Sequence, residues 1–149
     1  MYVVEKNMAE INITSTTGDS IDISVYGRTY PQESDRWDGN WLNSKIKIKA
    51  GNFCGTTDAL LRSDELEQLS KDIKRFLLKK MDTVVFSPME PWICFQMTGN
   101  KRGHIELTGE ITDRLGTGNV LKYQFELSRP DLEVILKKVD VILQEFPII

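Results

Sequence analysis

The segment DRWDGNW, residues 35–41, places two of the three tryptophans of the chain within seven positions, together with two aspartates and an asparagine. Indole rings can stack on sugars while carboxylate and amide groups bond to sugar hydroxyls, so a carbohydrate or small-ligand site built on Trp37, Asp38, Asn40 and Trp41 is one interpretation. Exposed aromatic side chains also concentrate binding energy in protein interfaces, so a partner-binding surface is a second interpretation.

A structural role is the third interpretation of this segment. The dipeptide Asp38-Gly39 is a strong turn sequence, and Trp37 and Trp41 flank it. Both indoles would then pack against the core, while Asp35 or Asn40 bonds to backbone amides within the loop. We favour this structural turn, with the other two interpretations as alternatives.

Nucleophilic catalysis of the Ser-His-Asp or Cys-His kind needs an imidazole, and His104 is the only histidine. It follows Gly103 in the turn sequence GNKRG, and alternation along the next strand places it on the same face as Glu106. A hydrolase would need both side chains in one deep pocket. We interpret His104 as a surface or loop-anchoring residue, and we expect the protein not to be an enzyme.

No cofactor or metal site is predicted. Cys54 and Cys94 lie 40 residues apart, without the short spacing that zinc ligands show, and are expected to be free thiols. The glycine-containing sequences GNKRG and GTGN suit hairpin turns, and neither leads from a strand into a helix as a phosphate-binding loop does.

The elements that position these residues are mostly strands, because apolar residues alternate with polar ones over much of the chain. About eight strands are predicted, near residues 11–13, 21–25, 45–50, 53–61, 83–87, 92–97, 105–111 and 121–127. Alternation implies one wet face, and therefore a largely antiparallel sheet. The longest stretch without a period is residues 28–40, which contains most of DRWDGNW.

Two segments show helical spacing instead. The first begins near Ser63, a predicted N-cap, and the second runs from about Pro130 to Gln144. The order is therefore ββββα-ββββα, an α+β fold with both amphipathic helices packed on the sheet. A shift of 66 residues aligns the two helices, for example Leu66 with Leu132, which is compatible with an internal duplication and equally with two independent amphipathic helices.

Composition indicates one α+β domain over residues 1–149, with 40% hydrophobic and 28% charged residues. The net charge of -3 and the lack of a basic stripe beyond Lys45, Lys47 and Lys49 argue against direct binding of nucleic acid. Charged residues near the N-terminus argue against a secretion signal, and no apolar run is long enough to span a membrane. We expect a cytoplasmic protein.

Several motifs, in this order, resemble the WapI-type immunity proteins of bacterial polymorphic toxin systems. They are DRWDGNWL (Asp35 to Leu42), a lysine-rich strand, GNFCG (Gly51 to Gly55) before a leucine-rich helix, RGHIELTGEI (Arg102 to Ile111), GTGNVLKYQFEL (Gly116 to Leu127) and ILQEFP (Ile142 to Pro147). The resemblance covers roughly residues 35–147.

The resemblance implies a protein that binds the C-terminal toxic domain of a cognate toxin, in the best-known case a tRNA-cleaving nuclease, and neutralises it by stoichiometric occlusion. Acidic side chains would steer association with a basic nuclease. The candidate partner-binding residues are Asp19, Asp22, Glu33, Asp35, Asp38, Glu106 and Glu110. Shared motif residues would instead form the scaffold, namely Trp37, Asp38, Gly39, Trp41, Gly103 and His104.

Overall fold

The computed structural model describes residues 9–149; residues 1–8, which provided part of the argument against a secretion signal, lie outside the described residues. The order is ββββα-ββββα, as predicted. The strands are β1 (Ala9–Thr14), β2 (Ser20–Arg28), β3 (Trp41–Ala50), β4 (Phe53–Arg62), β5 (Thr83–Phe86), β6 (Ile93–Gly99), β7 (His104–Thr112) and β8 (Val120–Ser128). The helices are α1 (Ser63–Leu77) and α2 (Arg129–Glu145).

The strands form two antiparallel sheets of four strands each, in the orders β1-β2-β3-β4 and β5-β6-β7-β8. Every pairing joins strands that are consecutive in the chain, so both sheets are simple meanders. The predicted alternation gives each sheet a buried inner face and a polar outer face. On β2, for example, Ile21, Ile23 and Val25 are buried while Asp22 lies on the outer face.

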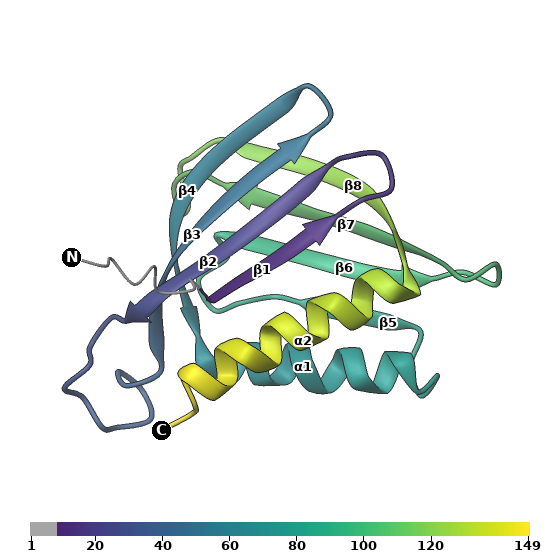
Figure 1. The fold of residues 1–149 in the computed structure, drawn as a ribbon. Coiled ribbons are helices and arrows are strands. Elements are labelled where there is room, and N and C mark those ends of the chain that lie inside the picture. Colours follow the sequence, from purple (N-terminus) through teal and green to yellow (C-terminus); the bar gives the residue numbers. More distant parts are fainter. Residues whose placement is uncertain (1–8) are drawn as a thin grey trace, which may run out of the picture.

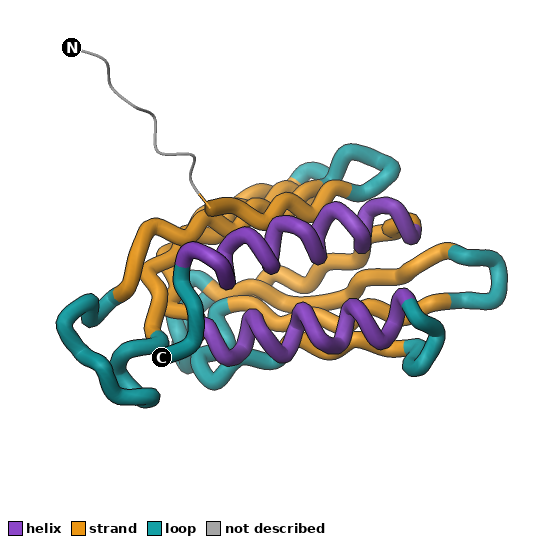
Figure 2. Tube along the Cα trace, turned by 60° about the horizontal axis from the view of Figure 1, so that its bottom comes forward, coloured by secondary structure: helices purple, strands orange, loops and turns teal. Residues whose placement is uncertain are grey.

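The two helices lie side by side along one side of the sheets (Figures 1 and 2). Helix α2 packs along β1, and α1 packs along β5, so each helix covers an edge of the sheet from the other half of the chain. Between the helices, the Ser70 hydroxyl donates to Asp140 over 2.6 Å, and Arg129 donates to the Leu77 carbonyl over 2.7 Å. The buried apolar residues of both sheets and both helices form one contiguous cluster.

Both helices begin with a capping interaction, but the first begins differently from the prediction. The N-cap of α1 is Arg62 rather than Ser63, because the strand pairing continues until the Ser63 amide donates to the Asn40 carbonyl at 3.0 Å. The Glu65 carboxylate then accepts from the Arg62 amide. In α2, Asp131 accepts from both the amide and the hydroxyl of Ser128. Over residues 9–149 no helix has the length and apolar character needed to cross a membrane.

Candidate partner-binding site

The longest loop joins β2 to β3 over residues 29–40 and carries DRWDGNW at its end. It folds tightly at Gly39, where a Cβ atom would lie 2.6 Å from the Asp35 carbonyl oxygen and 2.9 Å from that of Glu33. The Gly39 amide donates to the same Asp35 carbonyl over 3.0 Å. Glycine is therefore required at this position by close backbone approach.

Arg62 holds this loop against the start of α1. Its guanidinium lies between two indoles, 5.0 Å from the ring centroid of Trp37 and 4.9 Å from that of Trp41. It donates to the carbonyls of Trp37 (2.6 Å) and Arg36 (2.8 Å), and its Nε lies 3.0 Å from an oxygen of Asp64. Only 4% of this side chain is exposed, so its bonds to the loop are made away from water.

Two further side chains fasten the loop to the C-terminal segment. The buried amide of Asn40 donates to the Arg36 carbonyl and accepts from the Ile149 amide, each over 2.9 Å. Arg28 donates to the carbonyls of Gly39 (2.7 Å) and Pro147 (2.5 Å). The loop is thus bonded to both β2 and the end of the chain, which makes it a fixed part of the molecule.

The Asp35 carboxylate caps the turn by accepting from the amides of Trp37 and Asp38, each at 2.8 Å. The hydrogen bond from the Asp38 amide is the main cause that lowers the pKa of Asp35. Another carboxylate, Glu65, ties the β5–β6 loop to α1 by accepting from the Met89 amide at 2.6 Å. Its partial burial raises the pKa of Glu65.

The two indoles of DRWDGNW differ in exposure. Trp41 is buried, with 8% exposed, whereas 58% of Trp37 is exposed. The expectation that both indoles pack against the core is wrong for Trp37, whose exposed ring lies against the Arg62 guanidinium. Arg62 was not identified as a site residue from the sequence, since its burial depends on a loop more than 20 residues away.

A second region is the outer face of the sheet β5–β8, where Glu106 and Glu110 lie on β7. Glu126 of β8 lies directly opposite Glu106, and Lys122 lies opposite Glu110, with its amine 3.8 Å from that carboxylate. The Gln124 amide donates to Glu106 at 3.2 Å. Glu126 was not identified as a site residue from the sequence, although it shares with Lys122 the polar face of β8, between the apolar residues of that strand.

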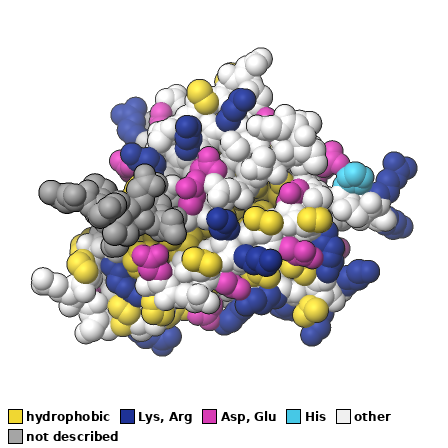
Figure 3. Space-filling model, in the orientation of Figure 1, with side chains coloured by type: hydrophobic (Ala, Val, Ile, Leu, Met, Phe, Trp, Pro, Cys, Tyr) yellow, Lys and Arg dark blue, Asp and Glu magenta, His cyan; other side chains and the backbone are white. Residues whose placement is uncertain are grey.

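His104 begins β7, is exposed and bonds through Nδ1 to Glu126. The space-filling view shows the histidine close to basic side chains at one end of the molecule (Figure 3). It lines a hollow of about 590 Å³ with residues that include Phe76 and Arg129, but Glu106 does not line that hollow. The condition for a hydrolase built on His104 and Glu106 is therefore not met.

The remaining predicted acidic residues lie elsewhere. Asp19, in the turn between β1 and β2, accepts from the Gly51 amide at 2.8 Å, and this bond is the main cause that lowers the pKa of Asp19. Asp22 is on the outer face of β2, where it accepts from Asn12 at 2.8 Å. The seven candidate acids thus fall into separate regions and do not form one cluster. Across residues 9–149, no three His, Cys, Asp or Glu side chains are grouped to hold a metal ion.

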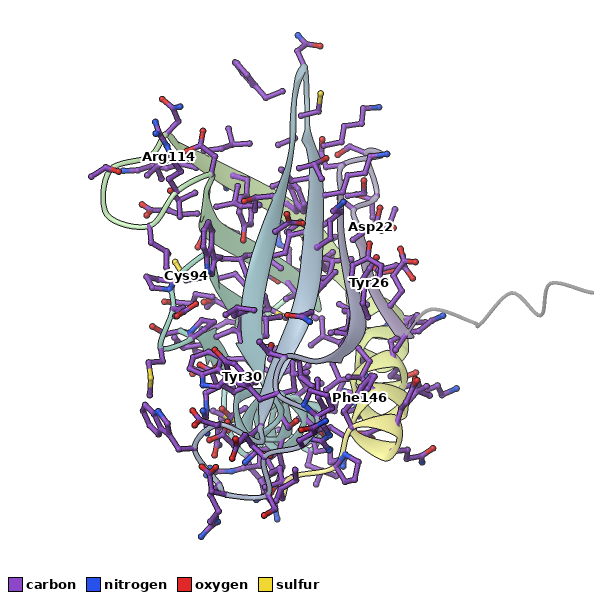
Figure 4. The ribbon with its side chains drawn as sticks, turned by 90° about the vertical axis from the view of Figure 1, so that its left-hand side faces the viewer. Asp22, Tyr26, Tyr30, Cys94, Arg114 and Phe146 are labelled. Carbon is purple, nitrogen blue, oxygen red and sulfur yellow. The ribbon has the colours of Figure 1, made fainter. Side chains whose placement is uncertain are left out.

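An aromatic groove on the outer face of the sheet β1–β4 was not predicted. Tyr26, Leu60 and Trp92 line it, together with the ion-paired Lys45 and Asp58, and its volume is about 480 Å³. Tyr26 is 51% exposed, close to a register irregularity that follows Val25 in β2. Figure 4 shows Asp22 and Tyr26 on one side of the β3–β4 hairpin, and Cys94 and Arg114 on the other side.

Comparisons with known proteins identify the family and the fold. Two solved structures share the fold, "Crystal structures of trypanosoma bruciei MRP1/MRP2" (TM-score 0.53, 9% identity, covering 94% of this chain and 86% of that one) and "Structure of a guideRNA-binding protein complex bound to a gRNA" (TM-score 0.53, 8% identity, covering 93% and 92%). A comparison with curated protein sequences finds no match. Residues 12–147 match the profile of the immunity protein WapI-like family. The chain therefore belongs to the WapI-like immunity protein family.

Proposed function

We propose that this immunity protein binds the C-terminal toxic domain of a cognate toxin and neutralises it by stoichiometric occlusion in the cytoplasm of the cell that makes both. The observation that carries this proposal is the family match over residues 12–147, which spans both sheets and both helices. Occlusion requires a stable surface and no reacting group. The fixed loop of residues 29–40 and the rigid meanders are consistent with that requirement.

The acidic outer face of β7 and β8 is the surface that we propose for steering the toxin domain. Glu106 and Glu126 face each other in the strand register, and like charges in that position repel. Gln124 donates to Glu106 and His104 bonds to Glu126, but among the described residues neither carboxylate is paired with a lysine or arginine. A lysine or arginine of a partner placed between them would relieve this repulsion. Charge complementarity of this kind raises association rates and excludes wrong partners, and its effect weakens as salt is added.

A tRNA-cleaving nuclease is the toxin type that we propose, because the RNA-binding site of such a nuclease would be basic. Glu33, which is exposed, and Asp38, which is half-buried, both in the loop of residues 29–40, would add to the acidic surface. Asp19 and Asp35 bond to backbone amides of their own loops, so we assign them a mainly structural role.

The alternative of a carbohydrate or small-ligand site has less support from the geometry. Asn40 and Trp41 are buried, and the Asn40 amide is already bonded to Arg36 and Ile149. Of the four proposed sugar-contacting residues, Trp37 alone is exposed. A titration of tryptophan fluorescence with a panel of glycans tests this alternative, and a saturable change abolished by Trp37→Ala would restore it.

Co-expression with the toxin domain encoded beside this chain tests the leading proposal. Growth should be rescued, and the two proteins should co-purify in a 1:1 ratio. Toxicity that persists at equal expression, together with the absence of a complex in size-exclusion chromatography, would exclude the proposal.

A charge reversal tests the steering surface separately. In Glu106→Lys, we expect association of the inactivated toxin domain to slow by about tenfold at low salt and by much less at high salt. Asp72→Lys, at a partly exposed position of α1 where the carboxylate accepts from Gln68, is the control with the same change of net charge. Equal effects of the two variants would indicate that net charge alone, rather than this surface, steers the partner.

A further inference from the structure

Two of the four sheet edges are covered by helices, and a third receives one backbone bond from a turn. Helix α2 packs along β1 and helix α1 packs along β5. At β8, the Thr16 amide from the β1–β2 turn donates to the Glu126 carbonyl at 3.4 Å. Among residues 9–149, no strand pairs with the outer edge of β4, and no backbone bond from another segment reaches residues 54–60.

The pairing of β4 with β3 shows which main-chain amides and carbonyls of β4 are not bonded within the sheet. A two-residue turn, Gly51 and Asn52, joins β3 to β4, and Ala50 pairs with Phe53 across it. Just beyond the other end of the strand, the Ser63 amide donates to the Asn40 carbonyl. The same alternation of bonded and unbonded residues therefore holds at both ends of β4. Odd-numbered residues of β4 therefore bond to β3, and the amides and carbonyls of the even-numbered residues point away from it. These residues are Cys54, Thr56, Asp58 and Leu60.

The usual protections of an edge strand are missing from this part of β4. Natural edges carry lysines, prolines or bulges that prevent pairing with another chain. The segment from Phe53 to Leu61 contains no lysine or proline, and its pairing with β3 runs without a shift in register. Phe53 is 68% exposed, and the next three residues are exposed as well.

Two hollows flank this edge, one on each side of the sheet. On the outer face, Asp58 and Leu60 line the aromatic groove with Tyr26 and Trp92. On the other side, β4 residues from Cys54 to Thr57 line a hollow of about 300 Å³ with the facing ends of β7 and β8. Side chains of a strand paired with β4 would point alternately into these two hollows.

The chemistry of the hollows defines the occupant. The groove at Tyr26 and Trp92 suits an apolar or aromatic side chain. The second hollow has one charged residue in its lining, Asp113, and would therefore suit a basic side chain. A second copy of this chain does not supply that base through the same edge, because Asp58 is the only charged residue from Phe53 to Leu61.

We propose that β4 accepts an extended segment of the toxin domain as a fifth strand of the sheet β1–β4, with a basic side chain of that segment directed to Asp113 and an apolar one to Trp92. This inference rests on the proposed function, since it names the surface by which the toxin domain is held. Main-chain bonds to Cys54, Thr56, Asp58 and Leu60 provide affinity, and the two hollows provide specificity.

Residue-resolved amide hydrogen exchange of the whole protein, free and mixed with the purified, inactivated C-terminal domain of the neighbouring toxin, tests the inference. In the free protein, the amides of residues 54, 56, 58 and 60 should exchange rapidly, while those of residues 55, 57 and 59 are already slow. On binding, the even-numbered amides should slow by about tenfold or more. This alternating pattern distinguishes strand addition from general burial of the surface.

Other outcomes of the exchange experiment would overturn the inference in distinguishable ways. A complex in which the even-numbered amides keep their exchange rates would remove strand addition and leave the proposed function standing. Failure to form any complex would remove both. Protection that appears without the toxin domain and grows with protein concentration would assign the edge to a second copy of this chain.

A pair of substitutions at one residue tests the same contact by affinity. Thr56→Pro removes an amide that points away from β3, so pairing within the sheet is retained, whereas Thr56→Val keeps the amide and loses the hydroxyl. We expect Thr56→Pro to weaken binding by about tenfold or more and Thr56→Val to change it by less than about twofold. Equal affinities of the two variants would contradict the inference, and the exchange experiment applies unchanged if Thr56→Pro does not fold.

Discussion

Strands β4 and β8 precede the two helices at equivalent positions, 66 residues apart, yet they differ in what they bury. Leu61 and Leu127, the last inward residues before each helix, are both fully buried. Further from the helix, the inward-facing side chain of β8 is larger than its equivalent in β4 at each of three positions. The pairs are Ala59 with Phe125, Thr57 with Tyr123, and Gly55 with Leu121.

This difference determines how much each strand contributes to the core. The large side chains of β8 fill the space over the sheet β5–β8, and Tyr123 crosses Gly109 so that its hydroxyl reaches the Cys94 carbonyl at 3.1 Å. The small side chains of β4 bury little, which leaves its first half exposed on both faces. Strand β8 therefore supplies core volume, while the equivalent strand β4 supplies little of it in its first half.

The residues before the helices differ in a related way. The Ser128 hydroxyl donates a hydrogen bond to Asp131 in the first turn of its own helix. Arg62, at the equivalent position, bonds to Asp64 of its own helix and also to the loop of residues 29–40. The first half thus uses its N-cap residue to fix a long loop, and the second half uses it only to begin a helix.

Truncation of the inward residues should give the largest difference between the halves. Phe125→Ala removes a buried ring whose centroid lies 5.3 Å from that of the Tyr123 ring. We expect it to lower the free energy of unfolding by about 4 kcal/mol. Thr57→Ala, on β4, should change it by less than about 0.5 kcal/mol because the site is partly exposed. Urea denaturation measures both, and similar losses would show that β4 contributes to the core as β8 does.

Removal of the N-cap side chains should show the next largest difference. Arg62→Ala leaves the Trp37 carbonyl without its donor, leaves the Arg36 carbonyl with only the donor from Asn40, and removes the cation from two indoles, so we expect a loss of about 3 kcal/mol. Ser128→Ala should cost about 1 kcal/mol, as for an ordinary cap.

Tryptophan fluorescence provides the control for this pair. The emission of Trp37 and Trp41 should change in folded Arg62→Ala and remain as in the native protein in Ser128→Ala, because the Arg62 guanidinium lies over both rings. An unchanged spectrum in Arg62→Ala, with equal losses of stability in both variants, would contradict the anchoring role.

Tyr123→Phe refines the comparison by removing a single bond. Burial raises the pKa of the Tyr123 hydroxyl, and this hydroxyl donates to the Cys94 carbonyl. We expect a loss of about 1 kcal/mol in thermal or urea unfolding, with the fold retained, because the ring still covers Gly109. A loss as large as that of Phe125→Ala would mean that the hydrogen bond, and not side-chain volume, distinguishes β8 from β4.

The sequence allowed most of the fold to be predicted, because alternation and helical spacing are local patterns. Eight strands, two helices and their order followed from residues such as Ile21, Ile23 and Leu66. The division of the strands into two sheets could not be predicted, since it depends on which edges the helices cover. The start of α1 was placed one residue late, because Ser63 resembles an ordinary cap and the bond of its amide to Asn40 is a tertiary contact.

The candidate site was less predictable for the same reason. The sequence drew attention to DRWDGNW, and the loop that contains it is indeed the longest. The difference between Trp37 and Trp41 depends on Arg62, which is distant in sequence. The open edge of β4 also depends on contacts that are made elsewhere, by α1, α2 and the turn that contains Thr16, so no local pattern in β4 could reveal it.

Acid should have the smallest effect, and it should act on both halves alike. Asp35 in the first half and Asp113 in the second each accept backbone amides, and hydrogen bonds, chiefly from the Asp38 amide and the Asn119 side chain respectively, lower their pKa values below 3.8. The unfolded chain therefore binds protons more readily, so the stability from these bonds is present above pH 3.8 and is lost as the pH falls through the lower, folded values.

Amide exchange below pH 4 measures this loss at each loop. The amides of Trp37 and Asn119 should lose protection together as the pH falls, because the carboxylate that each one bonds to becomes protonated. Both carboxylates are exposed, so the rest of the molecule should keep its protection over the same range. If the Trp37 amide remained protected where that of Asn119 opened, Arg62 and Asn40 alone would hold the first loop, and the difference between the halves would extend from their strands to their turns.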